Sequence, residues 1–163
     1  GHALDLSIAD GEFTAASSFD STAPTSNVFT LGNTEGANNS SYNYIAYCWH
    51  AVPGYSKFGN YIGNGSSDGP FIYTGFKPAW VLWKRLTDDG SDWGIVDAER
   101  NPMNVVGQTV YPSTSAQENT NNYCDFLSNG FKIRGTSGFQ NATSKNYIYM
   151  AFAEQPFTRN RAR

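Results

Sequence analysis

Short stretches that alternate apolar and polar residues recur along the chain, and they predict strands rather than helices. Strands are expected at residues 27–31, 43–50, 71–76, 79–86, 92–97, 130–134 and 146–153. Thr87 to Ser91 (TDDGS) has the composition of a hairpin turn between the fourth and fifth of these strands. Residues 112–122 are almost wholly polar and indicate an exposed loop. No stretch predicts a long helix, so the pattern favours an all-β protein.

Residues 53–80 combine glycines with aromatic residues at close spacing. A helix does not tolerate so many glycines, and a disordered linker does not carry so many rings. Glycine permits positive-φ turns, whereas aromatic rings supply the area that short strands bury. This stretch therefore predicts closely spaced strands and shaped loops.

Two of the predicted strands repeat one pattern. Residues 43–50 and 146–153 both begin Asn-Tyr-Ile, and each places three apolar side chains at alternate positions. One interpretation is that equivalent strands lie side by side; the other is that similar strands converge on similar composition. Either one indicates an antiparallel β-sandwich of jelly-roll or lectin-like topology.

The length of 163 residues favours a single domain. Gly1 and His2 look like the scar of a cleaved tag, and the alternation of Leu4, Leu6 and Ile8 suggests an edge strand. The expected organisation is a tag remnant (1–2), an N-terminal connecting segment (3–26), the β-sandwich domain (27–157) and a basic C-terminal tail (158–163).

The composition narrows the classes of partner. Only 15% of the residues are charged, and aromatic residues are frequent, which is typical of extracellular or particle-surface β-domains. A net charge of −3 without a basic stripe argues against nucleic acid as the main partner. No apolar run is long enough for a membrane-spanning helix, so membrane insertion is not expected.

The two cysteines and the single internal histidine exclude several chemistries. Cys48 lies within an apolar strand pattern and is expected to be buried, while Cys124 follows a polar loop; a disulfide between them stays open as an alternative. With His2 assigned to the tag, His50 is the sole native histidine. One histidine excludes a multi-histidine zinc site and argues against a Ser-His-Asp triad.

Clustered carboxylates provide a weak metal candidate. Asp88, Asp89 and Asp92 offer oxygen ligands for Ca²⁺, although the alternative is a hairpin turn without a metal. A glycosidase needs two carboxyl groups about 5 to 9.5 Å apart across one sugar, and nothing in the sequence imposes that geometry. No cofactor other than Ca²⁺ is expected.

Glycan binding fits the composition better than catalysis. Sugar sites stack an aromatic face on the sugar ring and aim a few polar groups at its hydroxyls. Two groups of residues offer this combination, one beside the predicted hairpin and one in the glycine-rich stretch. The candidate ligand-binding residues are Trp83 and Trp93 in the first group, and Tyr55, Tyr61, Asn60 and Asn64 in the second. The alternative for each ring is a structural role in the core.

Several motifs together resemble a domain of uncharacterised function that recurs in tail-fibre and other structural proteins of bacteriophages, especially marine ones. The resemblance spans residues 43–157, and its motifs are specific in combination. They are residues 44–59 (YIAYCWHAVPGYSKFG), 63–65 (GNG), 68–70 (DGP), 75–80 (GFKPAW), 92–93 (DW), 97–100 (DAER), 126–132 (FLSNGFK) and 147–154 (YIYMAFAE). The chain departs from this pattern at residues 158–163, which extend past the usual end.

The resemblance implies a concanavalin-like β-sandwich in a virion, on its exposed surface or tail, and offers no catalytic residues to transfer. The expected function is recognition of a host-surface glycan during adsorption, by a non-enzymatic module that also contacts other virion proteins. At a fibre tip, the resemblance implies a homotrimer. The alternatives are a structural decoration or assembly domain of the virion without a ligand, and a glycan depolymerase.

Overall fold

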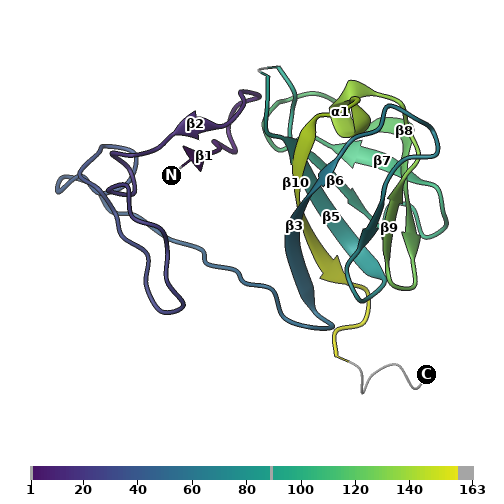
Figure 1. Cartoon of the computed structure of the whole chain (residues 1–163), viewed down its shortest axis with the longest axis horizontal. Coiled ribbons are helices and arrows are strands. Elements are labelled where there is room, and N and C mark those ends of the chain that lie inside the picture. The colour runs from purple at the N-terminus through teal and green to yellow at the C-terminus, as the bar shows by residue number, and fades with distance from the viewer. Residues whose placement is uncertain (1, 89, 158–163) are drawn as a thin grey trace. The chain divides into compact units, whose positions relative to one another are not determined.

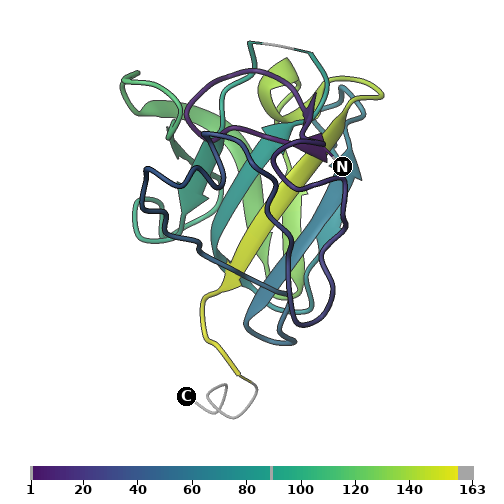
Figure 2. The ribbon, with the colours of Figure 1, turned by 90° about the vertical axis from the view of Figure 1, so that its left-hand side faces the viewer.

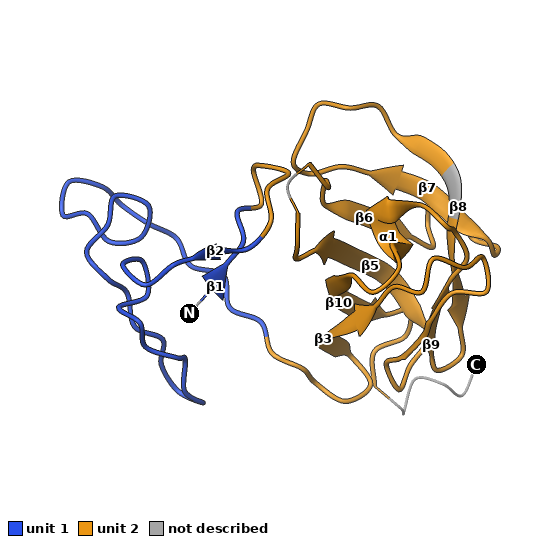
Figure 3. Ribbon diagram, turned by 45° about the horizontal axis from the view of Figure 1, so that its top comes forward, with its two compact units in different colours: residues 1–5, 12–49 blue, residues 6–11, 50–163 orange. Residues whose placement is uncertain are grey.

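The computed structural model describes residues 2–88 and 90–157, with the side chains of Asn121 and Asn122 excepted. The chain forms two compact units (Figure 3). Unit 1 comprises Gly1–Asp5 and Glu12–Trp49, and unit 2 comprises Leu6–Gly11 and His50–Arg163. The division after Trp49 differs from the predicted domain start at residue 27. No helix among the described residues is long and apolar enough to cross a membrane.

Unit 1 contains little regular structure. Its strands β1 (His2–Ala3) and β2 (Phe13–Thr14) form a two-stranded antiparallel sheet, and turns make up much of the rest. Among its described residues, Ala15 is the one apolar side chain that is buried. Unit 1 therefore has almost no hydrophobic core of its own.

Unit 2 is built on one antiparallel sheet of eight strands that curls into a nearly closed, sandwich-like barrel (Figure 1). The strands are β3 (Ser56–Ile62), β4 (Phe71–Tyr73), β5 (Pro78–Arg85), β6 (Gly94–Asp97), β7 (Val106–Val110), β8 (Asn119–Leu127), β9 (Gly130–Ile133) and β10 (Asn146–Ala153). Their order is β3-β10-β5-β6-β7-β8-β9-β4, so β3 and β4 are the two edges. Figure 2 shows the yellow β10 between its neighbours β3 and β5.

The core of unit 2 is largely aromatic. Alternate residues of each strand point inward, so Trp83 of β5 and Tyr147 of β10 are fully buried and Tyr61 of β3 is nearly so. Phe131 and Ile133 of β9 face them from the other part of the curled sheet. The single turn of helix α1 (Gly138–Asn141) lies at one end of the barrel, where Phe139 packs against Trp83.

The predicted fold class is confirmed, because unit 2 is an all-β, antiparallel, sandwich-like domain. The prediction for residues 146–153 matches β10. The strands on either side of the expected hairpin turn, β5 and β6, do pair, while Asp89 of that turn lies outside the described residues. Strands β7 and β8 were not predicted, and β8 begins inside the expected loop at residues 112–122.

Two predicted strands were wrong. Residues 27–31 are not a strand, because Asn27 and Val28 belong to a turn in which the Thr25 hydroxyl accepts hydrogen bonds from their backbone N–H groups. Residues 43–50 are also not a strand, since no neighbouring strand pairs with them and all of their side chains are exposed. Cys48 is consequently exposed and not buried as expected, and both Cys48 and Cys124 are free thiols.

Candidate functional site

The two tryptophans of the first predicted group lie in the core. Trp83 has no exposed surface and Trp93 exposes 7% of its surface. Trp83 makes edge contacts with the rings of Tyr123 and Phe139. The hairpin does bring the tryptophans close, because Gly94 pairs with Trp83 across β5 and β6. Their burial nevertheless removes both rings as surfaces on which a sugar stacks.

The residues of the second predicted group differ in their exposure. Tyr61 is buried and donates a hydrogen bond from its hydroxyl to the Gln140 carbonyl at 2.9 Å. Asn60 is exposed on β3. Tyr55 is 40% exposed, and its ring stacks on that of Phe157 with centroids 5.7 Å apart. Asn64 is exposed in the loop after β3, so of this group only the buried ring of Tyr61 is removed as a surface for a sugar.

The predicted calcium ligands are engaged with other side chains where they are described. The Asp88 carboxylate forms an ion pair with Lys145 at 2.8 Å, and this hydrogen bond lowers the pKa of Asp88 below its ordinary value. Asp92 accepts a hydrogen bond from the Ser113 hydroxyl at 3.3 Å. Asp89 lies outside the described residues, as do Gly1 of the predicted tag remnant and the basic tail at residues 158–163. Within the described residues, no group of three or more His, Cys, Asp or Glu side chains is placed to hold a metal ion.

Two exposed aromatic rings stand on the edge strand β4. Phe71 is 44% exposed and Tyr73 is 64% exposed, whereas Ile72 between them is buried. Phe71 and Tyr73 therefore share the outer side of the strand. Gly130 on β9 makes room for Phe71 and for the backbone of Ile72, because a Cβ atom at this position would lie 3.0 Å from the Phe71 ring and 2.1 Å from the Ile72 carbonyl oxygen.

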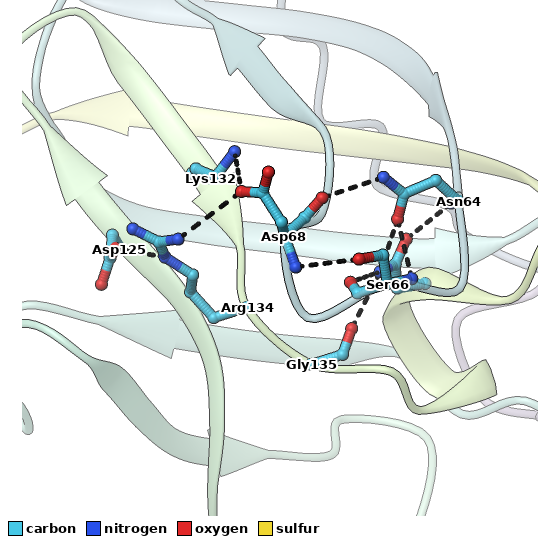
Figure 4. A network of polar contacts seen from close by, with 8 residues as sticks. Asn64, Ser66, Asp68, Asp125, Lys132, Arg134 and Gly135 are labelled. Atoms are coloured by element: carbon cyan, nitrogen blue, oxygen red, sulfur yellow. Dashed lines mark hydrogen bonds and ion pairs between the residues drawn. The ribbon is translucent and has the colours of Figure 1, made fainter.

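A group of charged side chains adjoins these rings (Figure 4). Lys132 on β9 lies directly opposite Phe71, and Asp125 on β8 lies opposite Lys132. The Asp68 carboxylate is 2.8 Å from Lys132 Nζ and 3.9 Å from Arg134 Nη1. Arg134 Nε in turn contacts the Asp125 carboxylate at 2.5 Å. The two cations and two anions balance, so the group has no net charge.

The β4–β9 face comprises Asp68, Phe71, Tyr73, Lys132 and Arg134. Asp68 is the most exposed of its polar members, with 82% of the side chain exposed. The hydrogen bond from Lys132 lowers the pKa of Asp68 from its ordinary value, with the charges of Lys132 and Arg134 acting in the same direction. Asp68 is therefore a carboxylate at neutral pH, and its oxygens can accept further hydrogen bonds.

A buried amide fixes the loop that carries Asp68. Asn141 Nδ2 lies 3.1 Å from Asn64 Oδ1, 2.7 Å from the Ser66 carbonyl oxygen and 2.8 Å from the Gly135 carbonyl oxygen. Asn141 Oδ1 accepts a hydrogen bond from the Asn64 backbone. Asn64 and Ser66 each bond the backbone of Asp68. Asn64, which the sequence analysis selected as a ligand residue, thus helps to position the face.

An open cleft lies elsewhere on unit 2, with ≈ 280 Å³ of empty space that includes open solvent. Its lining residues are Lys77, Ala98, Asn101, Pro102, Asn104, Val106 and Phe126. The side-chain oxygen of Asn101 accepts hydrogen bonds from the backbone N–H groups of Gly107 and Gln108. The side-chain amide of Asn104 donates to the Phe126 carbonyl and accepts from the Phe126 N–H. These side-chain amides support the surrounding loops, and the ring of Phe126 is buried.

Sequence reasoning missed most of the β4–β9 face because its members are distant along the chain. Residues 71–76 were expected as a strand, and residues 130–134 as another, but nothing in either indicated that the two pair. The available signal was the sequence Phe71-Ile72-Tyr73. If such a strand buries the side that carries Ile72, it exposes both rings on its opposite side.

Comparison with known proteins gives a family but no function. A model of DUF7483, a domain of unknown function, matches residues 1–156. No curated protein and no solved structure matches the chain. The resemblance to bacteriophage fibre proteins therefore stays a prediction. Because the family match extends from β1 through β10, the chain belongs to the DUF7483 family.

Proposed function

We propose that this domain is a non-enzymatic, virion-exposed module that binds a host-surface glycan through the β4–β9 face. The observation that carries the proposal is the pair of exposed rings on β4 beside the exposed carboxylate of Asp68. Aromatic rings supply an apolar surface for the faces of sugar rings, and neighbouring polar groups supply orientation. The proposal replaces the predicted tryptophans with Phe71 and Tyr73 as the stacking residues.

The charge balance of the face supports a neutral ligand. Lys132 and Arg134 already face Asp68 and Asp125, so an added anion meets carboxylates as well as cations. Sugar hydroxyls both donate and accept hydrogen bonds, and they therefore suit a surface that presents carboxylate, ammonium and guanidinium groups together. We expect a neutral, hydroxyl-rich glycan in preference to a sulfated or sialylated one.

The fixed position of Asp68 also supports binding. The loop from Asn64 to Asp68 is held by the buried Asn141 amide, and Lys132 lies on a paired strand. Groups that are already ordered lose less conformational entropy when a ligand binds. The shallow surface is expected to give modest affinity at each site, which several copies on one particle multiply. The location in a virion rests on the sequence resemblance.

The test begins with a bacterial glycan array probed with the whole chain, with and without Ca²⁺, followed by calorimetry on the best ligand. Phe71→Ala and Tyr73→Ala should each weaken binding by about 1 to 3 kcal/mol, the range for one stacked ring at a binding site. Phe13→Ala is the matched control, because Phe13 is 46% exposed but lies on β2. Circular dichroism should show that all three variants remain folded.

Each outcome bears on a separate part of the proposal. Binding lost in the Phe71 and Tyr73 variants and kept in the Phe13 variant supports the β4–β9 face. Saturable binding that is insensitive to both substitutions would place the glycan elsewhere. A calcium requirement would instead favour the turn that contains Asp88 and Asp92. An array without hits, from folded protein, would argue against a glycan receptor and for a structural role in the virion.

A further inference from the structure

Residues 42–49 of unit 1 expose five large apolar or aromatic side chains. Their largest exposed side chains are Tyr42 (57%), Tyr44 (42%), Ile45 (81%), Tyr47 (73%) and Trp49 (58%). The rings of Tyr47 and Trp49 stack with centroids 6.0 Å apart, as residues two apart on one side of an extended chain do. Monomeric soluble proteins seldom expose a contiguous apolar run of this kind.

Within the described part of the chain, the backbone of residues 43–49 is unpaired as well, and Tyr42 N–H donates to the Asn39 carbonyl. Within residues 2–88 and 90–157, no backbone hydrogen bond involves residues 43–49, and no strand of either sheet pairs with them. Only the Tyr44 hydroxyl is anchored, by the Glu35 carbonyl and the Asn39 amide. An extended, apolar segment with free N–H and C=O groups on both sides is a template for strand pairing.

The lack of charge and the apolar side chains of the segment make it compatible with a second, identical segment. Residues 36–49 contain no charged side chain, so nothing there selects a partner of opposite charge or repels an identical segment. Side chains on both sides of the extended chain are apolar: Tyr44, Ala46 and Cys48 on one, Ile45, Tyr47 and Trp49 on the other. Such a strand is suited to burial on both sides, and two copies related by a two-fold axis supply each other with backbone partners.

The exposed area of the segment reaches the lower limit for a stable pair. With large side chains at roughly 150 to 250 Å² each, these exposed fractions correspond to roughly 600 Å² per copy. Two copies together offer roughly 1,200 Å², which equals the lower limit for specific protein interfaces when all of it is buried. We infer that residues 42–49 are a self-association surface, at which two copies of the chain pair as antiparallel strands.

The test measures mass and thiol accessibility on the whole chain under reducing conditions. Light scattering coupled to size exclusion, across a dilution series, should show a dimer that dissociates on dilution. Cys48 is exposed within the segment, whereas Cys124 is buried in the core and serves as the internal reference. The rate of Cys48 alkylation should therefore fall as protein concentration rises, while Cys124 stays unreactive as long as the fold is intact.

A charge placed in the segment should prevent pairing. Ile45→Lys should raise the dimer dissociation constant at least roughly tenfold, because two lysines would meet in an apolar interface. Met103→Lys is the matched control, since Met103 is 80% exposed against 81% for Ile45 and lies in unit 2. It should leave the dimer unchanged. Both side chains are highly exposed, so neither substitution should unfold the protein.

The remaining outcomes overturn the inference. A monomer at all concentrations with Cys48 protected would mean that the segment is covered by its own chain. A dimer in which the alkylation rate of Cys48 does not depend on concentration would place the interface elsewhere. A trimer would favour the assembly implied by the fibre resemblance over two-fold pairing. Polydisperse aggregates that persist in Ile45→Lys would show that association is not specific to residues 42–49.

Discussion

Tyr61 and Tyr147 stack face to face across β3 and β10, with ring centroids 4.9 Å apart and ring planes 8° from parallel. Both hydroxyls reach α1. Tyr61 donates to the Gln140 carbonyl oxygen, while Tyr147 donates to the Gly138 carbonyl oxygen and accepts from the Ala142 amide. The pair thus joins an edge strand, a central strand and the helical turn at the end of the barrel.

Removing either hydroxyl should destabilise unit 2. Tyr61→Phe leaves the carbonyl of the buried Gln140 without this donor, which costs about 1 to 3 kcal/mol in the free energy of unfolding. Tyr147→Phe should cost less, because Gly138 and Ala142 are half-buried and the Gly138 carbonyl keeps Arg85 Nη1 as a donor. Urea denaturation measures both. Tyr73→Phe, at an exposed ring, should change stability by less than about 0.5 kcal/mol; equal effects at all three positions would contradict the role assigned to α1.

Alkaline pH should destabilise the protein through its buried phenols. Burial raises the pKa of Tyr61 well above the ordinary 10.0, and it also raises the pKa of Tyr147 and Tyr149. Burial likewise raises the pKa of Tyr111 to about 12. A raised pKa in the folded state means that the unfolded chain loses its protons first, so the stabilisation is fully present below pH 10 and is lost as the pH rises further. Urea denaturation from pH 8 to 11.5 should show this fall, and a smaller one in Tyr61→Phe.

Lys84 should be essential to the attachment of the segment Leu6–Gly11. Its side chain has no exposed surface, and Nζ donates to the Ala9 carbonyl at 3.0 Å and to the Ser91 carbonyl at 2.6 Å. Lys84→Met keeps the aliphatic stem and removes these bonds, so the free energy of unfolding should fall by about 1 to 3 kcal/mol. Lys57→Met, at an exposed position on β3, is the control. If the Lys84→Met variant were as stable as the parent chain, the Lys84 ammonium group would make no net contribution to stability.

Gln140 and Asn141 provide a matched pair of buried amides. Both residues lie on α1 without exposed surface. Among the described residues, the Gln140 side-chain oxygen and nitrogen have no hydrogen-bond partner, whereas the Asn141 amide is fully bonded. Gln140→Met should leave stability unchanged or raise it by about 1 kcal/mol, because it removes an uncompensated polar group. Asn141→Leu should lower stability by about 1 to 3 kcal/mol. Thermal unfolding of the two variants distinguishes these effects, and an equal loss in both would contradict the assignment.

The alternation of apolar and polar residues predicts a strand correctly where a neighbouring strand pairs with the segment. Residues 146–153 form β10 because β3 and β5 pair with its two sides. Residues 43–50 carry nearly the same pattern, yet no strand pairs with them, so the same residues stay exposed. Alternation reports that a segment suits a sheet, whereas the presence of a partner strand depends on the topology. The all-β fold class was therefore predictable, but which segments become strands of the sheet was not.

The candidate site was harder to predict than the fold. Trp93 and Phe71 are both aromatic residues next to predicted turns or loops, but Trp93 is buried and Phe71 is exposed. Which ring is exposed depends on the curl of the sheet and on the pairing of β4 with β9, which join residues about 60 positions apart. The Asp68 contacts with Lys132 and Arg134 have the same long-range origin.

The path of the chain between the two units affects how a protease would act on it. Leu6–Gly11 belongs to unit 2, although the residues on either side of it belong to unit 1. Residues 12–49 are thus connected at both ends to residues of unit 2: to Gly11 on one side and to His50 on the other. One cut inside this segment would not release it: the N-terminal fragment would remain attached through the bonds of Ala9 to Lys84 and Ser91, and the nicked protein would still migrate as one particle until it is denatured.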